Sequence, residues 1–228
     1  MKKRLSKYDF IIVASQEAKK LFKRFVKNKR TKILVQRYMK LDYFLKKTKF
    51  KKYKHLKNVL IAPTNFKSFP NLTMQNFLSD IIQNFLDKNF TVNYRPHPSN
   101  LNDKQTINLQ KKFKEFKNFY LDKSSNYLNS FNKSDLMITD LSGIAYTYLI
   151  LTSKPIIFYS TNERYLKKTY YAKLGYFSNR DKIGHKIYNK YSLFKLINSN
   201  KIISQKKTNI KKFREKFLKQ EKINFEFF

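Results

Sequence analysis

The sequence predicts an α/β protein with a Rossmann-like parallel sheet and helices on both faces of that sheet. Short apolar runs alternate with segments of helical periodicity, which is the pattern of βαβ units. The runs are apolar at consecutive positions, as expected for strands that helices cover on both sides. Polar residues follow several runs directly, and ligands of parallel sheets bind at these carboxyl ends.

The first predicted unit is a strand, a helix and a second strand. Residues 10–13 are predicted as a buried strand, and Ser15 as the cap of a helix that continues to about Val26. Residues 33–35 are the second strand. Because residues 46–57 are rich in lysine and lack periodicity, we expect a linker there and a domain boundary near residue 50.

The second predicted unit begins with a strand at residues 59–62, which Pro63 closes. Gly184 and His185 are expected in a turn. The most clearly periodic helix repeats apolar residues at spacings of three and four: Met74, Phe77, Leu78, Ile81, Ile82, Phe85 and Leu86. Further strands are predicted at residues 90–94, 119–121, 136–139 and 155–159, and further helices at residues 103–116 and 144–151.

The C-terminal segment, residues 207–221, is predicted as a basic helix with one apolar strip. The strip consists of Ile210, Phe213, Phe217 and Leu218. Two placements are open: the strip inserts into anionic lipid, or it packs back onto the sheet as the closing helix of the domain. The expected organisation is an N-terminal piece over residues 1–50, a Rossmann-like domain over residues 51–205 and this helix over residues 206–228.

Composition excludes several classes of protein. The chain has no cysteine, so it has no disulfide framework, thiolate zinc site or cysteine nucleophile. Three glycines form neither a dinucleotide-binding loop nor a P-loop. With 41% hydrophobic residues, the chain is too apolar for a disordered basic tail. No carboxylate cluster indicates a catalytic metal, and no cofactor is expected.

The net charge of +35 has two explanations. Lysine outnumbers arginine 42 to 8, and lysine, asparagine, isoleucine, phenylalanine and tyrosine are the residues that AT-rich codons favour. The alternative is selection for anionic partners such as phosphates or a membrane surface. No targeting or membrane-spanning segment is evident, so we expect a cytoplasmic protein, with peripheral attachment to the inner face of the cell membrane as a further expectation.

The loop after the strand at residues 136–139 is a candidate phosphate site. Thr139, Asp140, Ser142 and Gly143 lie between that strand and the next helix. We expect Ser142 to be the helix N-cap and Gly143 to let a ligand approach the backbone. The first turn of a helix offers free N–H groups to an anion. The alternative is that Asp140 and Ser142 only cap the helix.

A second candidate loop follows the strand at residues 90–94. His97 stands between two prolines, which hold its backbone extended. Such an imidazole can donate a hydrogen bond to a phosphate oxygen or protonate a leaving group near neutral pH. Arg95 is expected on the same anion. Thr64, after the strand at residues 59–62, belongs to the same rim.

These loops carry a resemblance to the CDP-glycerol glycerophosphotransferase family of teichoic-acid polymerases and primases. Residues 134–143 read SDLMITDLSG and resemble the family element S-D-x-x-I-T-D-Y-S-S, and residues 95–98 resemble its (K/R)-x-H-P element. Residues 59–64, VLIAPT, are similar to the strand that opens the family's donor domain. Residues 8–15 are similar to the last strand of its acceptor domain.

The resemblance implies the C-terminal half of a GT-B architecture, with residues 1–50 as a remnant of the acceptor-side domain. It implies transfer of glycerol phosphate from CDP-glycerol to a hydroxyl of a lipid-linked or polymeric acceptor in the cell envelope. His97 would contact the donor diphosphate as the catalytic residue. The donor- and phosphate-binding residues would be Thr64, Arg95, Thr139, Asp140, Ser142 and Gly143; Asp140 has orienting the Ser142 loop as its second expected role.

The sequence also departs from the family pattern. Leu141 replaces the usual tyrosine, and Gly143 replaces the second serine, which removes a hydroxyl donor. The family's acceptor domain, with its histidine base, has no counterpart here, so a truncated or split enzyme with a partner chain is expected. Two other functions remain open: a GT-B sugar transferase or nucleotide-sugar epimerase, and a non-catalytic basic module that binds RNA or membranes.

Overall fold

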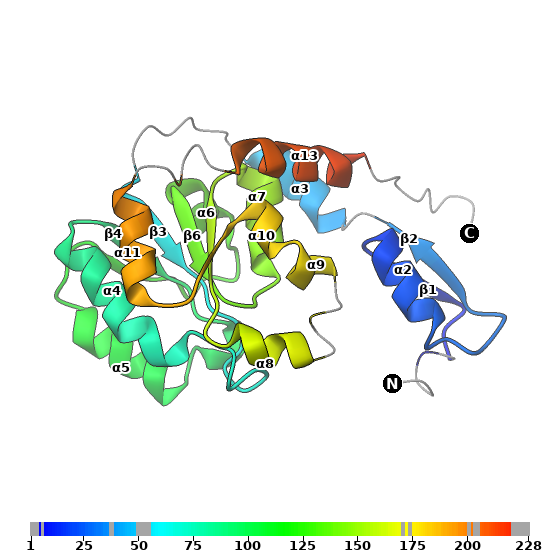
Figure 1. The fold of residues 1–228 in the computed structure, drawn as a ribbon, viewed down its shortest axis with the longest axis horizontal. Coiled ribbons are helices and arrows are strands. Elements are labelled where there is room, and N and C mark those ends of the chain that lie inside the picture. Colours follow the sequence, from blue (N-terminus) through cyan, green and yellow to red (C-terminus); the bar gives the residue numbers. More distant parts are fainter. Residues whose placement is uncertain are drawn as a thin grey trace.

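A six-stranded parallel sheet organises the larger part of the chain in the computed structural model, which describes residues 5, 7–36, 39–48, 56–169, 172, 175–199, 202 and 206–219 (Figure 1). The strands pair in the order β5-β4-β3-β6-β7-β8, all parallel. Their bounds are β3 Asn58–Ile61, β4 Thr91–Tyr94, β5 Phe119–Leu121, β6 Leu136–Thr139, β7 Ile156–Tyr159 and β8 His185–Ile187. The predicted fold class is confirmed.

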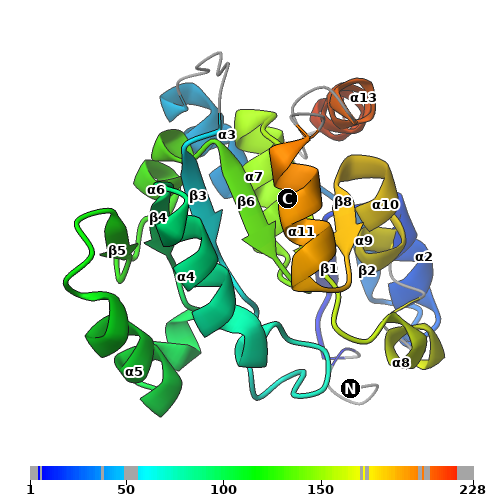
Figure 2. The ribbon, with the colours of Figure 1, turned by 60° about the vertical axis from the view of Figure 1, so that its left-hand side comes forward.

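Helices cover both faces of this sheet (Figure 2). Apolar side chains of α4, α5 and α11 pack on one face, and those of α3, α6, α7, α10 and α13 pack on the other. The helices are α3 Met39–Lys47, α4 Leu78–Asp87, α5 Lys104–Phe113, α6 Leu128–Lys133, α7 Ile144–Thr152, α8 Glu163–Lys168, α9 Gly175–Ser178, α10 Arg180–Ile183, α11 Lys190–Asn198 and α13 Lys207–Leu218. The short 3₁₀ helices are η1 Gln75–Phe77 and η2 Pro98–Asn100.

The central strand β3 shows why consecutive apolar residues are needed. Val59 and Ile61 point into the layer with α4, whereas Leu60 and Ala62 point into the layer with α7. Each of the four is at most 2% exposed. Because burial of a large aliphatic side chain stabilises a fold by about 1.5–3 kcal/mol, both faces of the strand contribute to the core.

The strand order reverses direction between β3 and β6. Successive strands β3, β4 and β5 extend to one side, and β6, β7 and β8 extend to the other. In doubly wound sheets, helices diverge to opposite faces at such a switch point and leave a crevice at the carboxyl ends of the two strands. The candidate loops after β3, β4 and β6 therefore lie at or beside this switch point.

A smaller parallel pair lies at the N-terminal side, drawn at the right of Figure 1. It consists of β1 (Phe10–Val13), α2 (Gln16–Lys23) and β2 (Lys32–Val35). Ser15 caps α2 by accepting the Ala18 N–H at 3.1 Å, as predicted. Ile11, Val13 and Ile33 form a separate apolar cluster with α2. This pair therefore has a core of its own.

Helix α3 was not predicted. Its residues Leu41 and Phe44 are buried on the face of the larger sheet that α7 also covers, and α3 contacts α7 there. The linker prediction was wrong at residues 46–47, which end this helix, and residues 49–55 lie outside the described part. Leucine and phenylalanine at helical spacing stabilise α3 despite its lysines, whose aliphatic stems and charged heads suit an exposed face.

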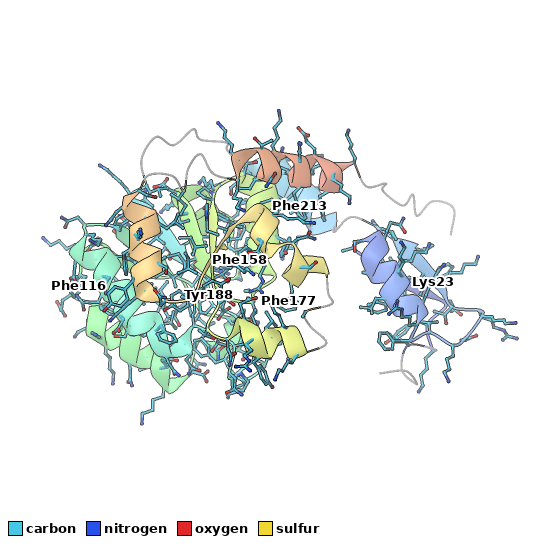
Figure 3. All side chains as sticks on the ribbon, in the orientation of Figure 1. Lys23, Phe116, Phe158, Phe177, Tyr188 and Phe213 are labelled. Atoms are coloured by element: carbon cyan, nitrogen blue, oxygen red, sulfur yellow. The ribbon has the colours of Figure 1, made fainter. Side chains whose placement is uncertain are left out.

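Helix α13 settles the placement of the C-terminal apolar strip. Ile210 is 4% exposed, and the Phe213 ring (Figure 3) lies 5.7 Å from the Tyr146 ring of α7. Arg214 Nε donates to the Ile150 carbonyl at 2.7 Å. The strip packs onto the domain, so the alternative of lipid insertion is wrong. Among the described residues, no helix is long and apolar enough to cross a membrane.

Strand β8 overturns the expected turn at Gly184 and His185. His185 begins β8, and Gly184 joins α10 to that strand in extended conformation. A Cβ atom on Gly184 would lie 2.7 Å from Phe158 Cε2 and 2.8 Å from the Ile156 carbonyl oxygen. Glycine is therefore required by the close approach of β7. The other predicted strands and helices occur near their expected bounds, while α6 and the segment from α8 to α11 were not predicted.

We predict that Gly184→Ala destabilises the fold by about 1–3 kcal/mol, because the new methyl group overpacks against backbone as well as a ring. Denaturant unfolding measures this change. Gly143→Ala is the matched control, since a Cβ atom there meets nothing within 4 Å, and we expect a change of about 0.5 kcal/mol or less. Equal stability of the two variants would contradict the packing of β8 described here.

Candidate functional site

The candidate site lies at the carboxyl ends of three adjacent strands, β4, β3 and β6. Because the three strands are parallel, the loops that follow them emerge on one rim. Thr64 lies in the loop after β3, His97 in the loop after β4, and Ser142 and Gly143 in the loop after β6. The fold thus brings these four predicted residues to one edge of the sheet.

Asp140 lies beneath this rim and connects its loops. Its side chain is fully buried. Oδ1 accepts the N–H groups of Thr64 at 2.8 Å and Leu141 at 2.6 Å, and Oδ2 accepts the Met74 N–H at 3.0 Å. Burial raises the pKa of the carboxyl, and the three N–H donors act in the opposite direction. The carboxylate orients loops, which is the second of its two expected roles.

Thr139 adds another connection between β6 and β3. Its Oγ1 donates to the Ala62 carbonyl at 2.6 Å, and the residue is fully buried. The hydroxyl therefore fixes the start of the Thr64 loop from inside the sheet. Thr64 is 8% exposed, and its own hydroxyl has no hydrogen-bond partner within the described part of the chain. This hydroxyl remains available to a ligand.

The Arg95 guanidinium makes its contacts with the loop that follows β5. Its Nη1 lies 2.5 Å from Asp122 Oδ2, and its Nη2 donates to the Ser124 carbonyl at 2.8 Å. Burial raises the pKa of Asp122, but hydrogen bonds from Ser124, Ser130 and Arg95 outweigh burial and hold it below its usual value. The guanidinium therefore joins β4 to the loop after β5. The sequence analysis missed Asp122, although an aspartate just after a short strand was the available signal.

His97 has the extended backbone that its two prolines predict, with φ −58° and ψ 141°. Its Nδ1 accepts the Ser99 N–H at 3.2 Å. The neutral imidazole must then carry its proton on Nε2, which makes Nε2–H a donor. Partial burial lowers the pKa of His97 below its ordinary value. At neutral pH the side chain thus presents one oriented N–H group.

Helix α7 begins at Ile144, as predicted, but its cap differs from the prediction. Its N-cap is Gly143 and not Ser142, and no side chain caps the helix. The Ser142 carbonyl accepts the Ala145 N–H at 3.3 Å, while the N–H groups of Gly143 and Ile144 have no acceptor among the described residues. Such free N–H groups at a helix start favour an anion. Gly143 is exposed and Ile144 is half-buried, so the start of this helix lies at the surface of the rim.

Leu141, the residue that departs from the family tyrosine, does not face this site. It is 5% exposed and packs with Leu72, Leu166 and Phe177 in a small apolar cluster. The Leu141 side chain therefore joins the rim loop to α8 and α9 through apolar contacts. Within the described ranges, no group of three or more His, Asp or Glu side chains is placed to hold a metal ion.

We predict that Asp140→Asn destabilises the protein by about 1–3 kcal/mol, because the new amide N–H group faces the Met74 N–H and leaves two buried donors opposed. Chemical denaturation provides the measurement. Asp87→Asn, at an exposed position on α4, serves as control with an expected change within about 0.5 kcal/mol. If the two variants unfold at the same denaturant concentration, Asp140 does not hold the rim loops.

We also predict that two of the three histidines, His97 and His185, titrate at separate pH values by NMR. His97 should titrate below 6.5, since burial disfavours the imidazolium and the Ser99 N–H opposes a proton on Nδ1. His185 should titrate lower, because burial and nearby Lys206 lower its pKa to about 4. As pH falls through its pKa, His97 should lose the Ser99 contact. A His97 midpoint above 6.5 would contradict the geometry of this turn.

Solved structures share this fold. The wall teichoic acid polymerase TagF matches with a TM-score of 0.62 and 22% identity, over 95% of this chain and 55% of TagF. A TagF variant soaked with CDPG matches with a TM-score of 0.58 and 20% identity, over 96% of this chain and 54% of that protein. MurG of Acinetobacter baumannii matches with a TM-score of 0.51 and 10% identity, over 92% and 66% respectively.

The chain spans about half the length of TagF. No protein of curated function matches the sequence significantly. A family model does match nearly the whole chain, over residues 1–224, and its description is CDP-glycerol:poly(glycerophosphate) glycerophosphotransferase. This match agrees with the two rim motifs and with the parallel sheet that presents them. The chain therefore belongs to the CDP-glycerol:poly(glycerophosphate) glycerophosphotransferase family.

Proposed function

We propose that this chain binds CDP-glycerol and contributes to transfer of glycerol phosphate to a hydroxyl group of a cell-surface polymer. The observation that carries the proposal is the set of unused donors on one rim: His97 Nε2–H, the Thr64 hydroxyl and the N–H groups of Gly143 and Ile144. All lie at the loops beside the switch point of the sheet. A diphosphate offers several negative oxygens, which such donors bind without a metal.

In the proposed reaction, the acceptor oxygen attacks the phosphorus of the glycerol phosphate group. The bond from this phosphorus to the bridging oxygen breaks, and CMP leaves with the bonding electrons. Negative charge grows on the CMP phosphate, where His97 and the α7 N–H groups stabilise it. Asp140 does not act as the base, because it is buried under the rim and already accepts three N–H groups. The acceptor hydroxyl proton therefore passes to a base on the acceptor side.

The contacts revise what each remaining residue does in this proposal. Arg95 supports the site indirectly, by joining β4 to the loop after β5 through Asp122, and does not touch the donor. Thr139 and Asp140 fix the positions of the loops after β3 and β6, while Ser142 and Gly143 face the phosphates of the donor. For the domain organisation, we propose a boundary between β2 and α3, since α3 packs with α7. The acceptor site then belongs to the N-terminal side or to a partner chain.

We predict that His97→Ala weakens CDP-glycerol binding by about 1–3 kcal/mol, the value of a hydrogen bond to a charged group. Isothermal titration calorimetry measures the affinity, and His97→Gln should recover part of it because glutamine Nε2 can donate from a similar position. Lys117→Ala, at an exposed position beside β5, is the control and should bind as the unmodified protein does. Equal affinity of His97→Ala and that control would exclude His97 from the donor site.

The second function that the sequence left open on this fold is a GT-B sugar transferase or nucleotide-sugar epimerase. The donor distinguishes the two. CDP-glycerol should raise the melting temperature of this protein, whereas uridine diphosphate sugars should not, if the family activity applies. Stabilisation by a uridine diphosphate sugar alone would instead support the second function.

We further propose peripheral contact with an anionic membrane surface, mediated by exposed lysines of α13 rather than by its apolar strip. These residues are Lys207, Lys211, Lys212 and Lys216. Because each exposed lysine contributes up to ~1 kcal/mol near an anionic surface, co-sedimentation with anionic vesicles should fall as salt rises. Replacing the four lysines with glutamine should reduce binding, and unchanged binding would contradict this contact.

A further inference from the structure

We propose that Asn100 is a positioning residue that sets His97 relative to Thr64, by bridging the loops after β4 and β3. The residue lies outside both family motifs and touches no ligand position. The inference rests on the proposed function in one respect: His97 and Thr64 are taken as donor-binding groups. Its structural part can be tested without any donor.

The bridge consists of three hydrogen bonds made by a fully buried residue. Asn100 Oδ1 accepts the Phe66 N–H at 3.2 Å, two residues beyond Thr64. The Asn100 backbone N–H donates to the His97 carbonyl at 2.7 Å. Asn100 Nδ2 donates to the Asp103 carboxylate. One residue therefore connects the loop after β3 and the start of α5 through its side chain, and the histidine turn through its backbone N–H.

The same turn fixes the imidazole. His97 is the N-cap of the short 3₁₀ helix η2, and the Ser99 N–H donates to His97 Nδ1. If the Asn100 bridge were lost, the turn would lose its connection to Phe66. The Ser99 contact that selects the Nε2–H tautomer would then be free to break. Asn100 thus acts on the donor site through the orientation of His97.

The bridge also completes a symmetric support for the central loop. From the β6 side, Asp140 accepts the Thr64 N–H at 2.8 Å; from the β4 side, Asn100 accepts the Phe66 N–H. Both side chains are 0% exposed. The backbone between residues 64 and 66 is therefore held from the two neighbouring strands. Preorganisation of this kind lowers the ordering cost of ligand binding.

The chemistry of the bridge requires an amide. Oδ1 must accept from Phe66 while Nδ2 donates to Asp103, and only asparagine supplies both at this length. An aspartate would keep the Phe66 contact but oppose the Asp103 carboxylate with a second negative charge. That incompatibility provides a rescue experiment, because swapping the two residues keeps the Phe66 contact and restores the contact between positions 100 and 103 with reversed polarity.

The test compares Asn100→Asp with the double variant Asn100→Asp/Asp103→Asn. In the double variant, the carboxylate at position 100 accepts from both the Phe66 N–H and the new amide at position 103, and the net charge is that of the unmodified chain. Asp103→Asn alone keeps an acceptor for Asn100 Nδ2 and controls for loss of charge. Two readouts are needed: the His97 tautomer from ¹⁵N shifts, measured without donor, and the affinity for CDP-glycerol from calorimetry.

We expect Asn100→Asp to lose the pure Nε2–H tautomer at pH 8 and to bind CDP-glycerol about tenfold more weakly, which corresponds to one charged hydrogen bond. The double variant should recover the tautomer and affinity at pH 8.

Unchanged tautomer and affinity in Asn100→Asp would overturn the proposal, as would a folded double variant that recovers neither. If the single variant does not fold, the double variant decides alone by the same two readouts. The His97→Ala measurement separates the two hypotheses. Wild-type donor affinity in His97→Ala overturns the proposed donor site, whereas the tautomer comparison still decides whether Asn100 positions His97.

Discussion

The buried Asp140 carboxylate is the interaction on which the rim of this protein depends. Three backbone N–H groups, from Thr64, Met74 and Leu141, converge on it from two separate loops. A buried carboxylate is unfavourable unless donors surround it, and these loops supply the donors by folding around it. The geometry of the rim is therefore set below the surface, and the groups that we propose to bind the donor take their positions from it.

Other charged side chains that the fold buries are also stabilised by ion pairs or by hydrogen bonds to the backbone. Lys154 is 3% exposed, yet its ammonium group donates to backbone carbonyls at the end of α6. Glu163 accepts Arg180 at 2.6 Å and Lys186 at 3.4 Å. Burial raises the pKa of Glu163, but its hydrogen bonds and these cations hold it below the usual value. Buried charges are thus paired or bonded to backbone, and most other lysines remain at the surface.

Much of the larger sheet could be predicted from sequence, because strands buried on both faces need consecutive apolar residues. The runs at β3, β6 and β7 gave the correct strands for this reason. Strand β8 was missed, since its sequence His-Lys-Ile carries little apolar signal and it depends on tertiary packing against β7. Helix α3 was missed because its lysines obscured Leu41 and Phe44.

The rim residues could be located from sequence, but their roles could not. Strand ends and family motifs indicated Thr64, His97 and Gly143, whereas the direction of each side chain depends on distant partners. Arg95 faces Asp122, which is 27 residues away in sequence. Asn100 had no signal beyond a turn-forming residue before a helix. Helix α7 begins at Ile144, as predicted, so its N-cap is the residue directly before it, Gly143, and not Ser142.

The amide resonances of Gly143 and Ile144 provide the most direct test of the central claim, that a diphosphate binds at the switch point between β3 and β6. Titration of ¹⁵N-labelled protein with CDP-glycerol should shift both resonances downfield, as expected for N–H groups that gain a charged acceptor. The shifts should saturate with the affinity measured by calorimetry. Saturable binding that leaves both resonances in place, while shifting others away from this rim, would contradict the account.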